Sequence, residues 1–185
     1  MKSEGFDTIG LLIPNNAVGD ANEASYGAAF EEAGLVMEVE RFEIEDIDMA
    51  APISRLDDKD VDAVIFWAVG PSPAYILASR EKVGLTDLPF YGDAAVSTSD
   101  ISSTVTEAQA ENVQMNTYAV SVRGTESEWL PGKKTLIDNL AAADVEYIAS
   151  LLPYALAYDA IIGAANAFAE LDGKSDDPDA WRQAM

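Results

Sequence analysis

The residues best suited to hold a small molecule lie in a turn that follows a strongly apolar segment. Val61–Ala68 is rich in β-branched and aromatic side chains, which predicts a buried strand of a parallel sheet, and Gly70-Pro71-Ser72-Pro73 ends it. Ser72 could hydrogen-bond a ligand carboxylate beside the backbone N–H groups at the start of the next helix, and Trp67 could line an apolar pocket. The alternatives are an ordinary helix cap for Ser72 and core packing for Trp67.

A carboxylate follows the next apolar segment, which Pro89 opens and Asp93 closes. Small ligands bind beyond the carboxyl ends of the strands in sheets of this kind, so Asp93 could pair with a cation or an ammonium group. A turn or helix-cap role is the alternative for Asp93. Asn15 and Asn16 follow the first predicted strand, and the default interpretation is that they are turn residues.

Covalent and metal chemistry find little support in the sequence. The chain has no Cys and no His, and it lacks the GxGxxG, GxxxxGK[ST], GxSxG and HExxH patterns. Asp58, Asp60 and Asp62 match positions 1, 3 and 5 of a calcium loop, but Ala63 and Val69 stand where that loop needs Gly and Glu. We therefore expect no catalytic residue, no metal and no cofactor.

The charge of the chain limits its partners. The net charge of −22 over 185 residues argues against nucleic acid and against an anionic membrane as partners. Most carboxylates are expected to be solvated, and a salty environment or the attraction of cations are further interpretations. The sequence has no apolar run long enough to span a membrane, and its first residues lack the apolar core of a signal peptide. The chain is thus expected to be cytosolic, mature or cut from a longer protein.

Strands and helices are expected to alternate through the first two thirds of the chain. This pattern predicts an α/β fold, a parallel-sheet three-layer α/β/α sandwich of Rossmann-like type with right-handed crossovers. In the first helix, Ala24, Ala28 and Phe30 are expected to face the core. The expected elements are the strands Thr8–Ile13, Val36–Phe42, Val61–Ala68, one from Pro89 and Val113–Val122, and the helices Asp20–Ala33, Met49–Leu56, Ala74–Val83 and Thr98–Ala110.

The remainder of the chain is expected to be helical. After a loop at Gly124–Gly132, helices are predicted at Lys133–Ala143 and Leu151–Leu171, with another starting at Pro178. No strands accompany them, and an apolar helix face needs a surface to cover it. We therefore expect a ligand-binding α/β lobe in residues 1–123 and, in residues 124–185, helices that pack on a partner surface or on a missing half. The face in question contains Leu156, Ile161, Ile162 and Phe168.

Three segments in this order resemble a known family: VDAVIFWAVGPSPAYILASREKVGL, LPFYGDAAVSTSD and YALAYDAIIGAANAFAEL. They are similar to the type I periplasmic solute-binding proteins of ABC transporters, and most of all to the branched-chain amino-acid-binding (Leu/Ile/Val-binding-like) group. The resemblance covers nearly all of residues 8–185, and Tyr158-Asp159-Ala160 is a strong point of likeness. It implies the second, carboxyl-side lobe, with a hinge near Ser121–Arg123 and the later helices belonging to the first lobe.

The resemblance also implies where a ligand would bind. Family members place contacts in three loops, of which the first often carries a Tyr before a Gly; here Val18 stands before Gly19. The second loop corresponds to the turn after the central strand, including Val69 and Gly70, and the third carries an acid that matches Asp93. The full set of expected ligand-binding residues is Asn16, Val18, Trp67, Val69, Gly70, Ser72 and Asp93.

The function that the resemblance implies is capture of a small amino-acid-like solute for an ABC importer, by hinge closure between two lobes. The implied partners are that solute and an ABC permease, and the implied location is the periplasm or, as a lipoprotein, the cell surface. A fragment of this kind is also expected to form a homo-oligomer that covers its apolar helix face. The alternatives are a ligand-sensing domain of a receptor or regulator with the same fold, and an enzyme on a flavodoxin-like sheet, which the absent His, Cys and phosphate loop disfavour.

Overall fold

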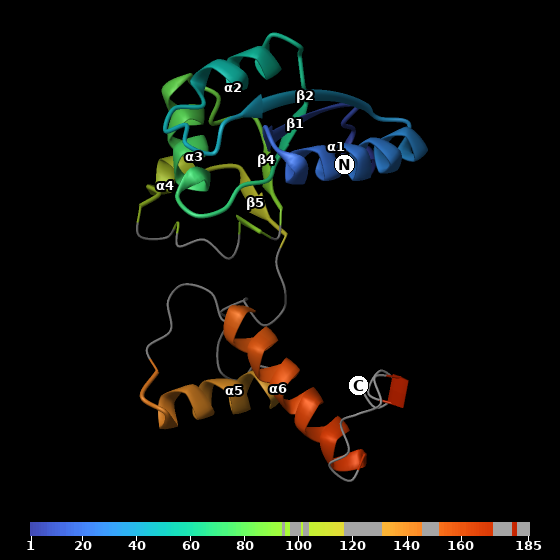
Figure 1. Ribbon diagram of the computed structural model, residues 1–185. Coiled ribbons are helices and arrows are strands. Elements are labelled where there is room, and N and C mark those ends of the chain that lie inside the picture. The colour runs from blue at the N-terminus through green and yellow to red at the C-terminus, as the bar shows by residue number, and fades with distance from the viewer. Residues whose placement is uncertain are drawn as a thin grey trace. The chain divides into compact units, whose positions relative to one another are not determined.

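The chain divides into two compact units, Met1–Tyr118 and Ala119–Met185 (Figure 1). The computed structural model describes residues 1–93, 95–96, 101, 104–116, 131–145, 152–171 and 179–180. The lobe boundary expected at residue 123 and the hinge expected near Ser121–Arg123 lie outside these residues, as does the loop expected at Gly124–Gly132 up to residue 130. Pro131 and Gly132, the last two residues of that expected loop, are helical instead. The boundary at residue 123 therefore stays a prediction.

The first unit is a parallel five-stranded sheet with helices between its strands, which confirms the predicted fold class. Its strands run in the spatial order β2-β1-β3-β4-β5 (Figure 1). A short 3₁₀ helix, Lys2–Glu4, precedes the first strand. The strands are β1 (Thr8–Pro14), β2 (Val36–Phe42), β3 (Ala63–Phe66), β4 (Phe90–Gly92) and β5 (Val113–Met115); the helices are α1 (Ala17–Ala33), α2 (Ala50–Asp57), α3 (Ser72–Lys82) and α4 (Glu107–Ala110).

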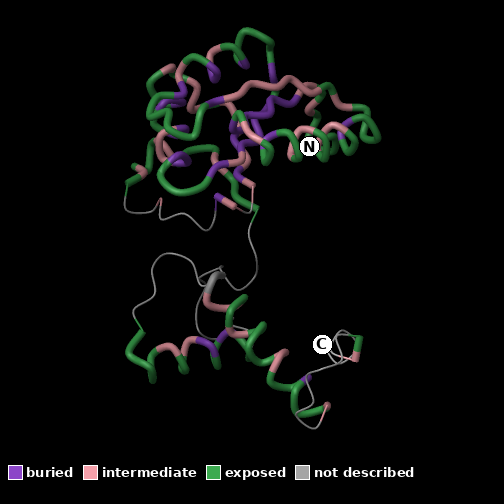
Figure 2. Tube along the Cα trace, in the orientation of Figure 1, coloured by how far each residue is buried: buried purple, intermediate pink, exposed green. Residues whose placement is uncertain are grey.

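Two apolar clusters cover the two faces of this sheet. Alternate residues of a strand point to opposite faces, so β1 sends Leu12 to one cluster and Leu11 to the other. The first cluster joins the sheet to α2 and α3, through residues such as Ile53 and Leu77. The second joins it to α1, through Phe30. Figure 2 shows that the buried residues of this unit gather along the strands and the inner helix surfaces.

Helix α1 differs from its prediction in start and in orientation. It begins at Ala17, three residues before the expected Asp20, because the side chain of Asn16 caps it. Ala24 and Ala28 are exposed, so their predicted inward position is wrong, whereas Phe30 is buried as expected. Tyr26, half-buried, packs against the α1-side cluster instead. Ala and Gly occur on several sides of this helix, so its apolar pattern did not fix which side faces the sheet.

The elements after β4 are shorter than predicted. The helix expected from Thr98 is confirmed only as α4, because a capping box of Thr106 and Gln109 starts it late. Residues 97–100 and 102–103 lie outside the described residues. The strand expected at 113–122 is described as β5 up to Met115, and residues 117–122 lie outside the description.

The second unit contains two long helices, α5 (Pro131–Ala142) and α6 (Leu152–Glu170), close to their predicted bounds. Asn139 on α5 donates a hydrogen bond to the hydroxyl of Tyr158 on α6 at 3.0 Å. Of the helix predicted from Pro178, only residues 179–180 are described, and both are helical. The predicted apolar face of α6 is exposed within this unit, by 61% at Leu156, 68% at Ile161, 43% at Ile162 and 48% at Phe168.

Candidate functional site

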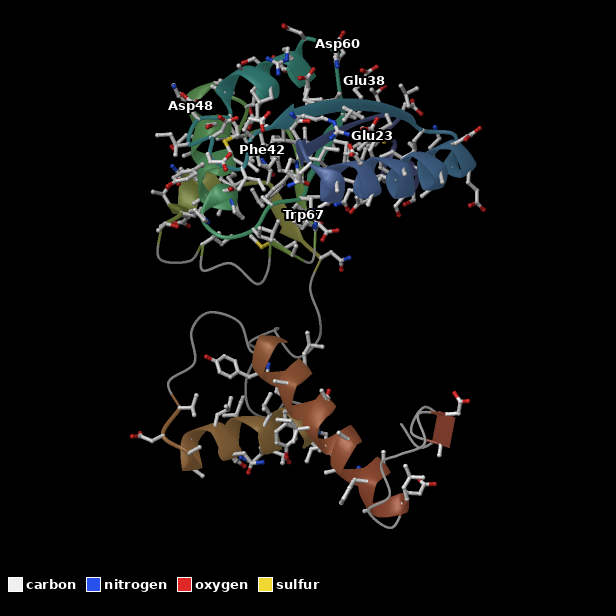
Figure 3. The ribbon with its side chains drawn as sticks, in the orientation of Figure 1. Glu23, Glu38, Phe42, Asp48, Asp60 and Trp67 are labelled. Atoms are coloured by element: carbon white, nitrogen blue, oxygen red, sulfur yellow. The ribbon has the colours of Figure 1, made fainter. Side chains whose placement is uncertain are left out.

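The carboxyl ends of the central strands form the edge at which a ligand site is expected. The chain leaves β1 for β2 on one side and returns to β3 on the other, which makes the gap beyond β1 and β3 the topological switch point of the sheet. Three loops start there or one strand away: residues 15–16 after β1, 67–71 after β3, and Asp93 after β4. Figure 3 labels Trp67 at the start of the second loop.

The first loop is occupied by helix capping. The Asn16 side-chain oxygen accepts hydrogen bonds from the N–H groups of Val18 at 2.9 Å and Gly19 at 3.1 Å, so Asn16 caps α1 and is not the simple turn residue that was expected. Asn15 donates to the carboxylate of Glu43 at 2.8 Å. Val18 remains 43% exposed on the first turn of the helix.

Gly19 makes this tight entry into α1 feasible. A Cβ atom at this position would lie 1.9 Å from the carbonyl oxygen of Pro14, a distance that no side chain tolerates. The glycine therefore lets the helix begin directly against the end of β1, which fixes the first loop at the switch point.

The second loop combines an anchored aromatic residue with an uncapped helix start. Trp67 donates its backbone N–H to Leu12 at 3.1 Å, and its half-buried ring packs against the α1-side cluster. Val69 is 42% exposed, and Gly70 has φ +62°, the left-handed conformation that favours glycine. Ser72 is the first residue of α3 and not its cap, because Pro71 holds the cap position.

Ser72 is a buried hydroxyl at the start of this helix, with only 4% of its surface exposed. Within the described part of the chain, its side chain makes no hydrogen bond, and Pro71 supplies no side-chain cap to the N–H groups beside it. Buried polar groups are normally hydrogen-bonded, so this hydroxyl still has bonding capacity to offer.

The third loop holds its carboxylate in place from two sides. Asp93 accepts a hydrogen bond from the N–H of Ala95 at 3.0 Å and another from the hydroxyl of Tyr26 at 2.9 Å (its own N–H donates to Phe66 at 3.0 Å). The pKa of Tyr26 is raised above its ordinary value. Burial is the first cause, because it disfavours the phenolate; the second is the Asp93 carboxylate, which accepts a hydrogen bond from the neutral hydroxyl and would repel a phenolate charge.

Strand register places Trp67 and Asp93 on the same face of the sheet. Ile65 pairs with Tyr91, and both belong to the α1-side cluster. The residues two positions further along, Trp67 and Asp93, therefore also point to this face, where Tyr26 meets them from α1. Tyr26 was missed by sequence reasoning because the orientation assigned to α1 was wrong, and a Tyr among small residues was the signal that could have found it.

The described residues also bear on metal binding and on membrane spans. They contain no group of three or more carboxylates placed to hold a metal ion. Asp62, from the rejected calcium pattern, accepts hydrogen bonds from the N–H groups of Asp7 and Thr8 at 2.8 Å each. No helix of the described residues is both long and apolar enough to cross a membrane.

Comparisons with known proteins agree with this fold. A family described as periplasmic binding protein matches residues 1–185. A search of curated proteins finds no match. Among solved structures, a protein of Rhodopseudomonas palustris has a TM-score of 0.75 at 22% identity, covering 100% of this chain and 52% of its own. A solute-binding protein of an ABC transporter from R. palustris, in complex with 4-hydroxybenzoate, has a TM-score of 0.78 at 18% identity, with 100% and 49% covered.

A fatty acid ABC transporter substrate-binding protein from Thermomonospora curvata is also similar, with a TM-score of 0.68 at 19% identity over 89% of this chain and 42% of that one. The chain thus spans about half the length of the solved structures that it matches. The family is one of binding proteins and not of enzymes. With the match over its whole length and the parallel α/β sheet in place, the chain belongs to the periplasmic binding protein family.

Proposed function

We propose that this chain is part of the extracytoplasmic solute-binding component of an ABC importer. The first unit would supply one wall of the ligand site, and a second lobe would close over it by hinge motion. The observation that carries this proposal is the group of Trp67, Asp93 and Tyr26 on one face at the carboxyl edge, since it offers an apolar wall beside fixed hydrogen-bonding groups.

Asp93 would bind a donor group of the ligand. A carboxylate has about four acceptor sites, and the two hydrogen bonds from Tyr26 and Ala95 leave capacity for a further donor. An amino-acid ammonium group is one such donor, as the resemblance implies. The buried Ser72 hydroxyl and the backbone N–H of Ser72 would then receive a ligand carboxylate. The neighbouring residues Pro71 and Pro73 have no N–H to offer.

An aromatic acid is the second candidate ligand, and the aromatic character of the site favours it. Trp67 and Tyr26 flank Asp93 on the same face, so a phenolic hydroxyl stacked there could donate to Asp93 in place of an ammonium group. The similar protein whose structure contains 4-hydroxybenzoate binds a ligand of this chemistry, although at 18% identity that likeness concerns the fold.

The isolated chain would bind such ligands weakly. One lobe supplies only half of the contacts, and each 1.4 kcal/mol lost weakens affinity about tenfold, so we expect a Kd on the order of millimolar. We also propose that the exposed α6 face drives self-association of the isolated chain. Light scattering that shows a clean monomer would contradict this part of the proposal.

A ligand-sensing domain of a receptor or regulator remains the alternative function, because the same fold serves both roles. Neighbouring permease and ATPase genes favour the importer. A kinase or DNA-binding segment on the same polypeptide favours the sensor.

Titration calorimetry of the full natural chain with leucine and with 4-hydroxybenzoate tests the ligand site. We expect Asp93→Ala to weaken the better ligand by about 1.5–3 kcal/mol, the range for a charged hydrogen bond. Asp58→Ala, which removes an exposed carboxylate just after α2, is the matched control and should leave affinity unchanged. Equal affinities for wild type and Asp93→Ala would refute the ligand role of Asp93.

A further inference from the structure

The loop between β2 and α2, Glu43–Met49, displays two large apolar side chains to solvent. Ile44 is 53% exposed and Ile47 is 73% exposed, although both are β-branched residues that usually pack inside a fold. The acids Glu43, Glu45, Asp46 and Asp48 alternate with them. Phe42 and Asp48, labelled in Figure 3, lie next to the two isoleucines along the chain.

Hydrogen bonds from several elements hold this loop in one shape. The side chain of Asp46 accepts from the N–H of Glu43 at 2.8 Å, and the N–H of Asp46 returns to the Glu43 carbonyl at 3.0 Å. At the far end, Asp48 pairs with Lys82 of α3 at 2.5 Å, and the N–H of Met49 donates to the buried Ser79 at 2.8 Å. A loop that is already ordered loses little conformational entropy when a partner binds it.

Single exposed apolar residues are common on protein surfaces and need no explanation. Here, however, two exposed isoleucines, Ile44 and Ile47, lie three positions apart in an ordered loop. The other exposed residues of this loop are carboxylates. The loop also follows β2, the edge strand of the described sheet, and so lies one strand beyond the β1–β3 switch point. The residues Trp67 and Asp93 follow β3 and β4, on the other side of β1 in the sheet, while Glu43 accepts a hydrogen bond from Asn15 in the loop after β1.

We propose that the loop Glu43–Met49 is a docking element for the extracytoplasmic surface of the importer's permease, where Ile44 and Ile47 enter an apolar pocket rimmed by Lys and Arg. This inference rests on the proposed function. Charge complementarity selects such a partner, because the loop carries four carboxylates and the chain a net charge of −22. A basic rim would be attracted to the loop from a distance, and the two isoleucines would supply the desolvated centre of the contact.

The test is direct binding of the full natural chain to its cognate permease–ATPase complex in phosphatidylcholine nanodiscs, measured by biolayer interferometry without added ligand. We expect Ile44→Ser combined with Ile47→Ser to weaken binding about tenfold or more. Val36→Ser is the matched control, because Val36 is 55% exposed at the opposite end of β2, and it should change affinity less than about twofold. Added NaCl should weaken wild-type binding, and Glu45→Gln should reduce that salt dependence.

Circular dichroism checks that the double variant folds, and Ile47→Ser alone replaces it if it does not. Wild-type binding that is absent, or that the isoleucine substitutions leave unchanged, overturns the proposal. The proposal is also overturned if the wild type forms a dimer that these substitutions dissociate, because the loop would then bind a second copy of this chain and not the permease. Calorimetry with leucine and 4-hydroxybenzoate on the wild type and on the same variants separates the two hypotheses. A wild type that docks but binds neither ligand rejects the proposed ligand site alone, whereas variants that bind ligand as the wild type does but dock more weakly support the docking proposal.

Discussion

The two faces of the sheet in the first unit differ in how completely they are closed. On the α2–α3 face, Ile53, Leu56, Phe66 and Leu77 have no exposed surface. On the α1 face, a single long helix packs on the sheet, and Tyr26, Trp67 and Tyr91 remain partly exposed at the edge of their cluster. Among the described residues, the α2–α3 cluster thus contains more of the buried apolar side chains, whereas the α1 face keeps aromatic and polar groups partly exposed.

Arg80 shows how the closed face accommodates a charge. Its side chain is fully buried on α3, stacks 4.9 Å from the centre of the Phe90 ring, and donates to the carbonyl groups of Leu85, Thr86, Leu88 and Glu111. Burial lowers the pKa of this guanidinium, with Glu111 and Asp87 opposing that shift through their charges. Arg80 thereby fastens α3 to the segments that precede β4 and β5. Of these two strands, β4 leads directly to Asp93.

The largest expected effect comes from removing this clamp. Arg80→Met should destabilise the chain by about 3–5 kcal/mol, because several buried carbonyl groups would lose their donor. Urea unfolding followed by circular dichroism measures the loss. Arg55→Met, at a half-exposed Arg paired with Glu40 at 2.7 Å, is the control and should cost less than about 1 kcal/mol. If the two variants lost similar free energies of unfolding, the buried Arg80 would contribute no more to stability than a surface ion pair.

Matched truncations compare the apolar content of the two faces. Leu77→Ala, on the closed face, should destabilise by about 2–5 kcal/mol because it leaves a cavity in a fully buried site. Met37→Ala, on the partly open α1 face, should lose roughly 1 kcal/mol, since less apolar surface returns to water. The same unfolding measurement applies, and equal losses would show that the α1 face is as closed as the other.

The hydrogen bond from Tyr26 to Asp93 should contribute a smaller, pH-dependent term. Tyr26→Phe should destabilise by about 1–2 kcal/mol at neutral pH. Because the folded pKa of Tyr26 is raised, its contribution is fully present below the unfolded pKa of about 10 and is lost as pH rises further. Unfolding at pH 8 and pH 11 should therefore show the two proteins converging at the higher pH. A gap that does not change with pH, or a double variant with Asp93→Asn that behaves additively, would argue against the coupling.

The smallest effect is expected at the exposed pair of Asp48 and Lys82. The pKa of Asp48 is lowered, first by the hydrogen bond from Lys82 and then by the N–H of Ala50. Its contribution is thus present above the unfolded pKa of about 3.9 and is lost as pH falls through the lower folded value. Asp48→Asn should lower the urea midpoint slightly at pH 7, and the difference should vanish at low pH and shrink in high salt. A difference that salt leaves unchanged would contradict an exposed ion pair.

Local signals in the sequence determined the alternation of elements and the parallel sheet. The apolar β-branched run of β3 predicted a buried strand, and all four of its residues are buried. Helix α1 ends at its predicted residue, Ala33, and α3 ends at Lys82, one residue before its predicted end. The glycines that follow, Gly34 and Gly84, have φ of +66° and +77°, the left-handed conformation that stops a helix. The shared edge of the three loops could be predicted as well, because the loops after parallel strands lie at one end of the sheet wherever the strands lie.

Tertiary structure alone decided which residues meet at that edge. The lateral order of the strands, the side of α1 that faces the sheet and the partners of Arg80 depend on contacts between residues far apart in the chain, such as Tyr26 with Asp93 across 67 positions. Helix α1 has many small Ala and Gly residues, so its apolar pattern is too weak to determine which side faces the sheet. Packing against β1 and β2 determined that side. The sequence by itself determined the fold and the edge, whereas long-range packing determined the chemistry that the edge presents.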